Sequence, residues 1–475
     1  MVGLSLHFQS FCLPILQAND QYPNIMPIRH AIKRSLSKAA WRAYNTYRKG
    51  VDYNTQFSRT AEILNAPRET IETFQAKRLQ RLLQHAYQTT PYYSEFLNGA
   101  RLDISRIPPL EKQAIREQSD RLYSTAYTQK QRIRNATGGS TGTPLTFYQD
   151  RGYWNQRNLS VYYFDQWAGW DFGEPQLIIW GALADLDKDG HWKHRLNNFW
   201  RNQYWLNGFR LTDTAMWAAF EKMNRCQPQT ILAYPSSLYQ FAKFILENDL
   251  TPLCKLKGII TSAEMLHPHY RTLAKTVFKT KVYNRYGSRE VGLIAMACAE
   301  GRMHINCRDL YFEIESPDPY TEPGEILITQ LNNYAMPFIR YRIGDVGLLS
   351  DEMCPCGNAL PVLAELLGRT TATFRTRTGA LIHGGYFTQQ FYDIDGVTQF
   401  QIIQESLKHC ILKVVINEKW TETTHRHLVQ RIQDALGATV VVTVELVDEI
   451  PLPPSGKREY TISKVDTDAD DLQKP

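Results

Sequence analysis

The most informative segment of the chain reads Thr137-Gly138-Gly139-Ser140-Thr141-Gly142-Thr143-Pro144. Its glycines allow close backbone approach and its hydroxyl side chains add donors, so the segment can form a loop that wraps phosphate oxygens. It is not the P-loop of nucleoside triphosphatases, because no Gly-Lys-Ser/Thr ending follows. By itself it is weak support for a phosphate site, since most stretches rich in Gly, Ser and Thr are plain turns.

Around this segment, short apolar runs alternate with helical patterns from Arg132 onward. The runs at residues 176–180, 230–234, 258–261 and 281–284 are typical of buried strands. Strands that alternate with helices predict a layered α/β domain. Upstream, the spacing of six residues predicts an amphipathic helix that ends before Thr90-Pro91: Phe74, Leu79, Leu82, Leu83, Ala86 and Tyr87.

The chain changes character towards its C-terminal end. Residues 397–404, 409–417 and 439–447 are predicted strands, and residues 422–436 a helix that stops at Gly437. This β-β-α-β pattern predicts a small α+β domain whose boundary lies between Gly368 and Phe374. It includes Pro451-Leu452-Pro453-Pro454-Ser455-Gly456-Lys457-Arg458, where a turn of Pro, Ser and Gly presents a lysine. Read alone, Lys457 is a solvated surface lysine.

Composition places the chain among ordinary globular enzymes. It has 475 residues, enough for two domains, with 43% hydrophobic and 21% charged residues. The net charge of +6 comes from 54 basic and 48 acidic residues, which is too diffuse for a nucleic-acid partner. Eight scattered cysteines favour a reducing cytoplasm over a disulfide framework. Neither a membrane span nor a signal peptide is predicted.

One local charge bias lies near the N-terminus. Between Met26 and Lys49 there are seven Lys or Arg residues and no Asp or Glu. Apolar residues recur at helical spacing within this segment: Ile28, Ile32, Leu36, Ala39, Ala43 and Tyr47. A basic amphipathic helix can lie on an anionic membrane surface. The favoured alternative is a helix packed on the protein body with a solvated basic face, because small residues are frequent in its apolar stripe.

Five motifs occur in the order found in adenylate-forming enzymes: the glycine-rich loop, Tyr286-Gly287-Ser288-Arg289-Glu290, Tyr341-Arg342-Ile343-Gly344-Asp345, Gly368-Arg369 and Lys457. The chain resembles in particular the phenylacetate-CoA ligase group and its CapK-like (capsular polysaccharide) and coenzyme F390 synthetase-like relatives. The resemblance covers roughly residues 70 to 465. Five ordered motifs are far more specific than any one of them.

This resemblance implies a fold of mixed α/β class. A large N-terminal adenylate-forming domain of layered sheets and helices would span residues 70–369, after a helical, basic extension at residues 1–69. A small, mobile α+β (ferredoxin-like) domain at residues 370–475 would carry the catalytic lysine. In the family this domain rotates after the adenylate forms, which removes the lysine and opens a path for the acyl acceptor.

The resemblance also implies a role for each motif. The loop from Thr137 to Thr143 would hold the departing pyrophosphate, Glu290 would hold Mg²⁺, and Lys457 would reach the carboxylate and the α-phosphate of ATP. Asp345 would accept hydrogen bonds from the ribose, with Arg369 nearby. The remaining implied residues line the adenine site (Ser262, Ala263, Glu264, Asn284, Arg285, Tyr286 and Gly287) and the substrate pocket (Tyr234, Pro235 and Ser236).

Two positions depart from the family pattern. Ala372 stands where an Asp is common, which puts the hinge residue in doubt, and Thr143 replaces a common Lys or Glu, so one charge near the phosphates is missing. Neither departure removes a group that the adenylation step requires.

Three functions compete for this chain. The leading one is an ATP-dependent acid:CoA ligase that acts on an aryl or arylacetic acid. The second keeps the adenylate but transfers the acyl group to an amine, a hydroxyl or a carrier-protein thiol in cell-surface or natural-product assembly. The third is a non-catalytic nucleotide-binding protein, against which the retention of Lys457, Glu290 and Asp345 argues. No residue specifies CoA binding, and a homodimer stays open.

A separate metal site is predicted from cysteine and histidine spacing. Cys298 is followed after five residues by His304, and a turn with Cys354 and Cys356 comes later in the chain. Three soft thiolates and one imidazole suit tetrahedral Zn²⁺, and similar cysteines occur in some members of the resembling group. Four protein ligands leave no open position, so the predicted zinc is structural. Cys307 is the main rival ligand.

Overall fold

The computed structural model describes residues 32–40, 52–97, 99, 102–137, 145–180, 198–208, 212–369, 373–378, 381–383, 387, 391, 394–451 and 460–465. They divide into two compact units. The first comprises the described residues within 1–59, 165–260 and 273–282, and the second those within 60–164, 261–272 and 283–475.

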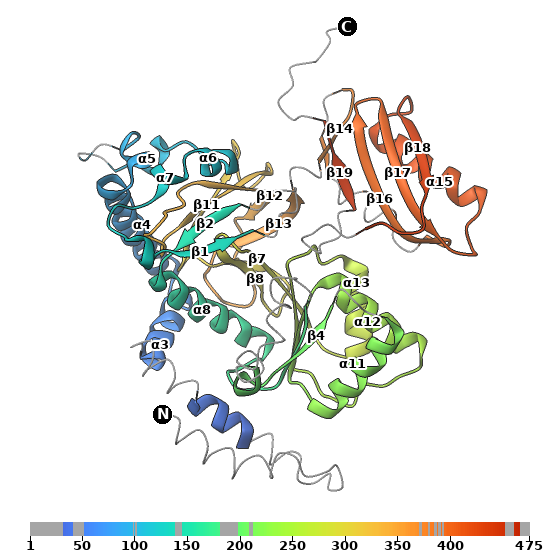
Figure 1. The fold of residues 1–475 in the computed structure, drawn as a ribbon, viewed down its shortest axis with the longest axis horizontal. Coiled ribbons are helices and arrows are strands. Elements are labelled where there is room, and N and C mark those ends of the chain that lie inside the picture. The colour runs from blue at the N-terminus through green and yellow to red at the C-terminus, as the bar shows by residue number, and fades with distance from the viewer. Residues whose placement is uncertain are drawn as a thin grey trace. The chain divides into compact units, whose positions relative to one another are not determined.

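The first unit is built on parallel strands. β3 (Gln176–Trp180) pairs in parallel with β4 (Gln203–Asn207) and with β5 (Thr230–Ala233), and β6 (Gly258–Ser262) lies next to β5. Helices α11 (Asp213–Cys226) and α12 (Pro235–Glu247) connect successive strands, as parallel pairing requires (Figure 1). Almost every residue of β3, β5 and β6 is buried, which explains their apolar sequences and confirms the predicted strands.

The second unit contains an antiparallel sheet. Its strand order is β10-β11-β12-β13-β9-β8-β7. The bounds are β7 (Val282–Ser288), β8 (Gly292–Ala297), β9 (Met303–Ile305), β10 (Leu310–Glu315), β11 (Gly324–Gln330), β12 (Tyr341–Ser350) and β13 (Val362–Arg369). The predicted amphipathic helix is present as α4 (Arg68–Thr89), and it ends before Pro91. Leu82 and Leu83 of α4 share one apolar core with Ile328 of the sheet.

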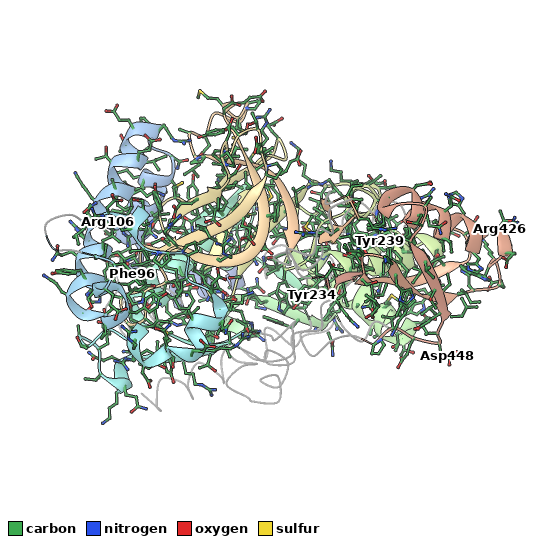
Figure 2. The ribbon with its side chains drawn as sticks, turned by 90° about the horizontal axis from the view of Figure 1, so that it is seen from above. Phe96, Arg106, Tyr234, Tyr239, Arg426 and Asp448 are labelled. Carbon is green, nitrogen blue, oxygen red and sulfur yellow. The ribbon has the colours of Figure 1, made fainter. Side chains whose placement is uncertain are left out.

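Short helices complete the N-terminal part of the described chain. They are α3 (Tyr53–Leu64), α5 (Pro91–Ser94), η2 (Ile104–Arg106), α6 (Lys112–Glu117), α7 (Ser119–Leu122), η3 (Gln129–Gln131), α8 (Arg151–Asp165) and η4 (Gln166–Ala168), and α13 (Pro268–Phe278) follows β6. Figure 2 labels Phe96, just after α5, and Arg106, at the end of η2. Buried Tyr92 and Tyr93 of α5 join the core that α4 forms with the sheet.

A two-stranded hairpin carries the glycine-rich segment. β1 (Ile133–Ala136) pairs antiparallel with β2 (Thr146–Gln149), from Ile133 opposite Gln149 to Ala136 opposite Thr146. Thr137 and Leu145 close the hairpin beyond the last pair, because the Leu145 amide donates to the Thr137 hydroxyl at 2.9 Å and the Thr137 amide donates to the Leu145 carbonyl at 3.0 Å. Residues 138–144, which connect these strands, lie outside the described residues.

The C-terminal part forms a sheet with one covering helix. β16 (Val397–Ser406), β17 (His409–Ile416), α15 (Glu422–Leu436) and β18 (Val441–Leu446) confirm the predicted β-β-α-β pattern. A further strand, β19 (Thr461–Ser463), pairs in parallel with β16 and gives the order β18-β17-β16-β19. A two-stranded ribbon of β14 (Thr373–Arg375) and β15 (Leu381–His383) precedes it. Arg426 of α15 and Asp448 after β18 lie at the surface (Figure 2).

Each end of α15 has an identifiable local cause. The Thr421 hydroxyl accepts from the Thr424 amide and caps the N-terminus, and Gly437, at φ 116°, follows the last turn. Leu428, Ile432 and Leu436 are buried on one side and pack against the sheet. The helical spacing in the sequence therefore identified the correct face.

Residues 32–40 form a helix that packs on the first unit through its basic side chains. The Lys33 ammonium donates to the Tyr204 hydroxyl at 3.0 Å, Arg34 pairs with Glu174 at 3.1 Å, and Lys38 pairs with Asp171. The apolar side chains of Ile32 and Leu36 are instead 53% and 38% exposed. The expectation of a solvated basic face is therefore wrong for these residues, because polar partners on the first unit (buried Glu174, half-buried Asp171 and Tyr204), which helical periodicity does not reveal, decide which face packs.

None of the described helices is both long and apolar enough to cross a bilayer. Contact of residues 26–49 with a membrane surface, the cytoplasmic location, the homodimer and the domain limits at residues 69 and 369 stay predictions.

Candidate nucleotide site and cysteine–histidine cluster

Glu290 lies in the tight turn between β7 and β8. Gly287 lies opposite Leu293 across this turn, and a Cβ atom at Gly287 would meet the Gly292 carbonyl oxygen at 2.5 Å. Only glycine therefore fits there, which gives the predicted site residue Gly287 a structural reason. Glu290 itself is 7% exposed, and the Tyr341 hydroxyl donates to its Oε1 at 3.3 Å.

Two side-chain amides hold the main chain of this turn. The Nε2 atoms of Gln149 and Gln330 donate to the Glu290 carbonyl oxygen at 3.0 and 2.6 Å. Gln149 ends β2, the strand that follows the glycine-rich segment, and Gln330 ends β11. The turn that carries Glu290 is thus tied to the hairpin that carries the predicted phosphate loop.

Asp345 lies on the same strand as Tyr341. Residues 341, 343 and 345 of β12 are buried while 342 and 344 are not, so the Tyr341 and Asp345 side chains share one face of the strand. The Tyr286 hydroxyl donates to Asp345 Oδ2 at 2.6 Å. Arg369 stands opposite Asp345 in the register of β12 and β13. The structure therefore brings Tyr286, Asp345 and the backbone of Arg369 together.

The other predicted adenine-site residues follow β6 and run along β7. Ser262 is the last residue of β6, and Ala263 after it has a φ of +75°, a left-handed conformation that is rare for residues other than glycine. Glu264 follows. Asn284 and Arg285 lie on β7, where the Asn284 side-chain amide contacts the Met303 sulfur at 3.7 Å. β6 and β7 are neighbours in the sheet, so these two segments are adjacent.

The predicted substrate-pocket residues belong to the first unit. Tyr234 follows β5, and Pro235 and Ser236 begin α12. The Tyr234 ring is 2% exposed and stacks on Trp180, with ring centroids 4.0 Å apart and 24° between the planes. Trp180 ends β3, which pairs in parallel with β5, so both rings lie at the carboxyl ends of neighbouring strands (Figure 2 labels Tyr234).

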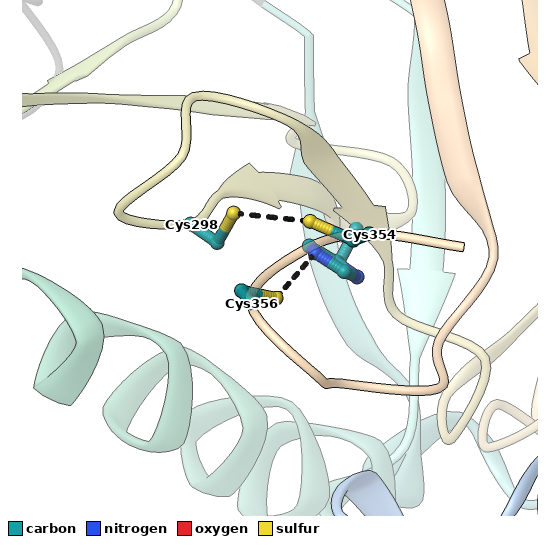
Figure 3. A group of neighbouring side chains, drawn as sticks. Cys298, Cys354 and Cys356 are labelled. Carbon is teal, nitrogen blue, oxygen red and sulfur yellow. Dashed lines mark hydrogen bonds between the residues drawn. The ribbon is translucent and has the colours of Figure 1, made fainter. Parts of the chain in front are cut away.

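The four predicted metal ligands lie close together. The ligand atoms of Cys298, His304, Cys354 and Cys356 all lie within 4.8 Å of one another. The Cys298 and Cys354 sulfurs are 3.6 Å apart, and the Cys356 sulfur lies 3.3 Å from His304 Nε2 (Figure 3). Cys307 lies outside this group, and burial raises the pKa of its thiol to about 12. The rival role for Cys307 is therefore not supported.

Two tight turns position the side chains of Cys298 and Cys354. Cys298 and Cys354 each begin a turn closed by a glycine amide three residues later, at Gly301 and Gly357, both with φ 82°. His304 Nδ1 lies 3.3 Å from the Leu360 carbonyl oxygen. A carbonyl can only accept, so Nδ1 carries the proton and Nε2 is left as the ligand. Burial lowers the pKa of His304, which favours the neutral imidazole that a metal binds.

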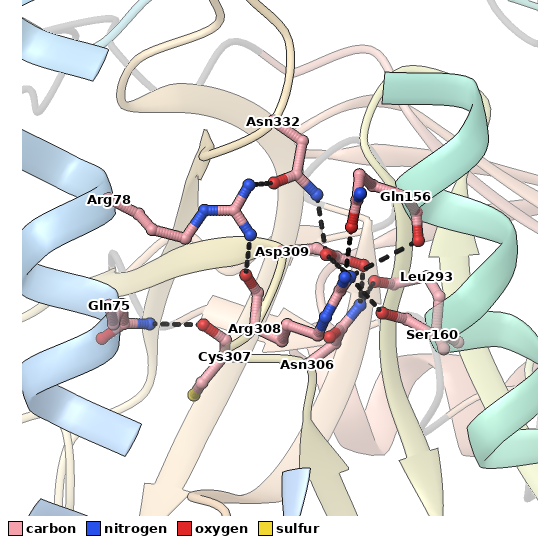
Figure 4. Close-up of polar contacts among 10 residues, drawn as sticks. All are labelled: Gln75, Arg78, Gln156, Ser160, Leu293, Asn306, Cys307, Arg308, Asp309 and Asn332. Carbon is pink, nitrogen blue, oxygen red and sulfur yellow. Dashed lines mark hydrogen bonds and ion pairs between the residues drawn. The ribbon is translucent and has the colours of Figure 1, made fainter. Parts of the chain in front are cut away.

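A buried polar network links α8 and β8 to the segments that follow β9 and β11. The Arg308 guanidinium pairs with Asp309 at 2.6 Å and donates to the Ser160 hydroxyl of α8 at 3.2 Å (Figure 4). Asn306 donates to the Leu293 carbonyl of β8 at 3.2 Å, and Asn332 donates to Asp309 at 2.7 Å. The two buried charges, on Arg308 and Asp309, pair with each other. We therefore interpret the network as structural: it holds α8 and β8 in place.

The structure leaves part of the prediction open and adds residues to it. Lys457 and the loop residues Gly138–Thr143 lie outside the described residues, and so does the hinge candidate Ala372. Sequence analysis assigned no role to Gln149, Gln330, Tyr341 or Trp180. The available signal was a polar residue at the end of a strand with an apolar centre, as Gln330 is after Ile326, Leu327 and Ile328.

Comparison with known proteins adds sequence and fold relatives. Residues 374–464 match the CapK C-terminal domain family. The chain is 22% identical over 408 residues to protein CapK of Staphylococcus aureus, covering 82% of this chain and 89% of that one. It is 23% identical over 450 residues to phenylacetate-coenzyme A ligase of Thermus thermophilus, covering 83% and 97%.

Solved structures give the same fold. A crystal structure of 2-hydroxyisobutyryl-CoA ligase in the postadenylation state superposes with a TM-score of 0.68 at 19% identity, over 85% of this chain and 92% of that chain. An open conformation of the same ligase, in complex with an adenylate and CoA, gives a TM-score of 0.57. The predicted mixed α/β fold with a smaller C-terminal sheet domain is therefore confirmed.

Proposed function

Because the chain belongs to the adenylate-forming superfamily, with CapK-like and phenylacetate-CoA ligase-like relatives, we propose that it activates a carboxylic acid with ATP and transfers the acyl group to a thiol. In the first step a carboxylate oxygen attacks the α-phosphorus, and pyrophosphate leaves as the acyl-adenylate forms. In the second step a thiolate attacks the acyl carbonyl and AMP leaves.

One observation carries this proposal. Tyr341 and Asp345 lie on one face of β12, where Tyr341 contacts the Glu290 carboxylate and Asp345 accepts from Tyr286. Glu290 and Tyr286 flank the same β7–β8 turn. Two carboxylates with little exposure thus lie on neighbouring elements, at the positions where the superfamily pattern expects a metal ligand and a ribose acceptor.

The chemistry of Glu290 fits a hard cation. In the described part of the chain its carboxylate accepts from a neutral phenol and pairs with no cationic side chain. A carboxylate in that state is a suitable ligand for Mg²⁺, which would supply positive charge next to the phosphate oxygens. We assign the loop Thr137–Thr143 to the pyrophosphate oxygens and Lys457 to the α-phosphate and the carboxylate, where a cation offsets the repulsion of two approaching anions.

The class of acid is inferred from an aromatic pair in the first unit, and the acceptor from the relatives. The stacked Trp180–Tyr234 pair next to Pro235 and Ser236 suits an aryl or arylacetic acid, since aromatic rings pack against one another. Coenzyme A is the leading acceptor, because the relative from Thermus thermophilus is a coenzyme A ligase. The CapK C-terminal domain match favours the alternative, an amine, hydroxyl or carrier-protein acceptor in cell-surface assembly.

Exchange of labelled pyrophosphate into ATP tests the first step. With a panel of aryl acids we expect exchange in the full chain and a loss of about 10²-fold or more in Lys457→Ala, because a charge aimed at the transition state is removed. Lys464→Ala is the matched control: it removes an exposed lysine of the same domain, which pairs with Glu405 at 2.7 Å. Equal exchange in both variants would contradict the role of Lys457.

The acceptor is tested by the release of AMP. Coenzyme A should accelerate AMP release if the acceptor is its thiol. A response to amines and none to coenzyme A would instead select the alternative acceptor class.

We also propose that Cys298, His304, Cys354 and Cys356 bind one structural zinc ion. Bond lengths of about 2.0–2.3 Å place the ligand atoms of tetrahedral zinc about 3.3–3.8 Å apart. The observed separations of 3.6 Å (Cys298–Cys354) and 3.3 Å (Cys356–His304) are close to this range. All four positions are taken by protein, so the ion would brace the fold and would not act on substrate.

A further inference from the structure

The carbonyl oxygen of Glu290 has an unusual pair of partners. Two glutamine side chains from different strands, Gln149 and Gln330, donate their amides to it, at 3.0 and 2.6 Å. Both side chains are almost completely buried, at 0% and 1% exposure. A carbonyl oxygen has two lone pairs, so this arrangement uses both of them. Burying two side-chain amides costs free energy unless their hydrogen bonds are made. These two hydrogen bonds therefore fix the positions of both glutamine side chains.

Gln149 is itself anchored by the residue that follows it in the chain. After Gln149 comes Asp150, whose carboxylate accepts from the Tyr153 and Tyr334 amides, both at 2.8 Å. The Asp150 amide donates to Asn333 Oδ1 at 3.2 Å. The carboxyl end of β2 is thereby fixed to the segment that follows Gln330. A shift of the glycine-rich hairpin would therefore move Gln149, one of the two donors that hold the Glu290 peptide.

These contacts fix Glu290 without neutralising it. The two amides act on the main chain, and the Tyr341 phenol at 3.3 Å acts on one carboxylate oxygen. All three donors are neutral. A lysine or arginine in the same place would hold the carboxylate equally well but would compete with a metal for its charge.

We propose that Gln149 and Gln330 are positioning residues that hold the Glu290 carboxylate, together with Tyr341, in the geometry that binds the metal of metal-bound ATP. This inference rests on the proposed function. It adds that the metal ligand and the hairpin strand β2 are held together by hydrogen bonds, so that the position of β2 and the metal affinity are coupled.

Equilibrium binding to the full-length protein tests the proposal without any chemistry. We expect Gln149→Met and Gln330→Met to weaken ATP binding in the presence of Mg²⁺ by about 10-fold, the lower end of the effect of losing groups that orient a metal ligand. AMP binding in the absence of metal should stay within about twofold, because Glu290 is assigned to the metal and not to the nucleoside. The double variant should lose less than the product of the two single effects, since both amides hold one oxygen.

Two further variants keep the test decisive. Tyr341→Phe retains the ring and removes only the hydroxyl, so it should show the same selective loss even if a glutamine variant folds poorly. Gln176→Met is the matched control: Gln176 is 2% exposed in the first unit and donates to the Thr230 hydroxyl at 3.4 Å. It should lower thermal stability and leave the ratio of the ATP and AMP affinities unchanged.

The outcomes separate this inference from the proposed function. If all three site variants lower the melting temperature yet keep the wild-type affinity ratio, the positioning role is overturned. If the wild-type chain binds ATP with Mg²⁺ and the variants lose that binding, but no acid supports pyrophosphate exchange, the positioning role stands and the proposed reaction fails.

Discussion

At the scale of single residues, Ala263 has the most informative backbone. Its φ of +75° is a conformation that costs a non-glycine L-residue roughly 1–2 kcal/mol. Such outliers persist where the surrounding structure holds them, and they concentrate at functional sites. Ala263 stands between Ser262 and Glu264, in the segment predicted to line the adenine. The strain is therefore consistent with a backbone shaped for a ligand.

Ala263→Gly should relieve this strain. We expect the variant to raise the free energy of unfolding by about 0.5–1 kcal/mol, because the gain in the folded state exceeds the entropy that glycine adds to the unfolded chain. Urea denaturation of the two proteins measures the difference. Ala219→Gly, in the interior of α11, should change it in the opposite direction by about 1 kcal/mol. Destabilisation by Ala263→Gly would show that the methyl group matters more than the dihedral angle.

Residue identities in the site could be predicted only where a motif marks them. Glu290 and Asp345 were found from ordered motifs, and the structure places them on neighbouring elements. Gln149 and Gln330 were not, because their role depends on a hydrogen bond across 141 and 40 positions of sequence. Nothing in the local pattern around a glutamine identifies a carbonyl so far away in the chain.

At the scale of elements, the β12–β13 hairpin links the cysteine–histidine cluster to the candidate nucleotide site. Cys354 and Cys356 lie in the turn between these strands, while Asp345 and Arg369 face each other towards the open end of the hairpin. Cys298 and His304 come from the end of β8 and from β9. A metal bound by all four would therefore clamp the turn of the hairpin to two strands of the same sheet.

Removal of this metal should loosen the hairpin. We expect about one zinc per purified chain and almost none in Cys354→Ser, since a three-ligand site with one weak hydroxyl binds zinc poorly. Amide hydrogen exchange should become faster in β12 and β13 and stay unchanged in β16 and β17, which serve as an internal control. Cys307→Ala should keep its zinc. A metal-free chain with unchanged exchange would discard the site.

Helices and strands were predictable where apolar residues follow a single spacing along the sequence. Helix α15 and strands β3, β5 and β6 occur where the apolar spacing indicated them, because burial of one face or of both faces dictates that spacing. β19 was missed, since a strand of three residues is too short to show a period. The orientation of helix 32–40 was wrong because ionic partners outweighed its weak apolar stripe.

At the scale of the whole molecule, the fold class follows from alternation and motif order together. Local patterns predicted an α/β body and a small C-terminal domain, and the order of motifs indicated a resemblance to adenylate-forming enzymes. The division of the chain into two compact units was beyond such reasoning, because each unit is assembled from segments widely separated in the sequence. A nucleotide that binds only the folded chain should stabilise the molecule as a whole.

ATP with Mg²⁺ should raise the melting temperature of the full chain. A ligand at 100 times its dissociation constant adds about 2.7 kcal/mol to the stability of the part that binds it. Lys457→Ala should retain most of this shift, because its lysine is assigned to the reacting carboxylate and α-phosphate more than to ground-state binding. Differential scanning fluorimetry provides the measurement. The absence of any shift in the wild-type chain would argue against a nucleotide site.

The ion pairs that Arg34 and Lys38 of helix 32–40 make with the first unit have a practical consequence. Glu174 is 1% exposed and pairs with Arg34 and Lys257, and a Cβ atom at Gly173 would meet the Arg34 carbonyl oxygen at 2.9 Å. Trimming the protein to residue 70, where the predicted large domain begins, would remove one cation from the buried Glu174 carboxylate and uncover the surface on which helix 32–40 packs. Truncated versions meant for crystallisation should therefore start upstream of Ile32.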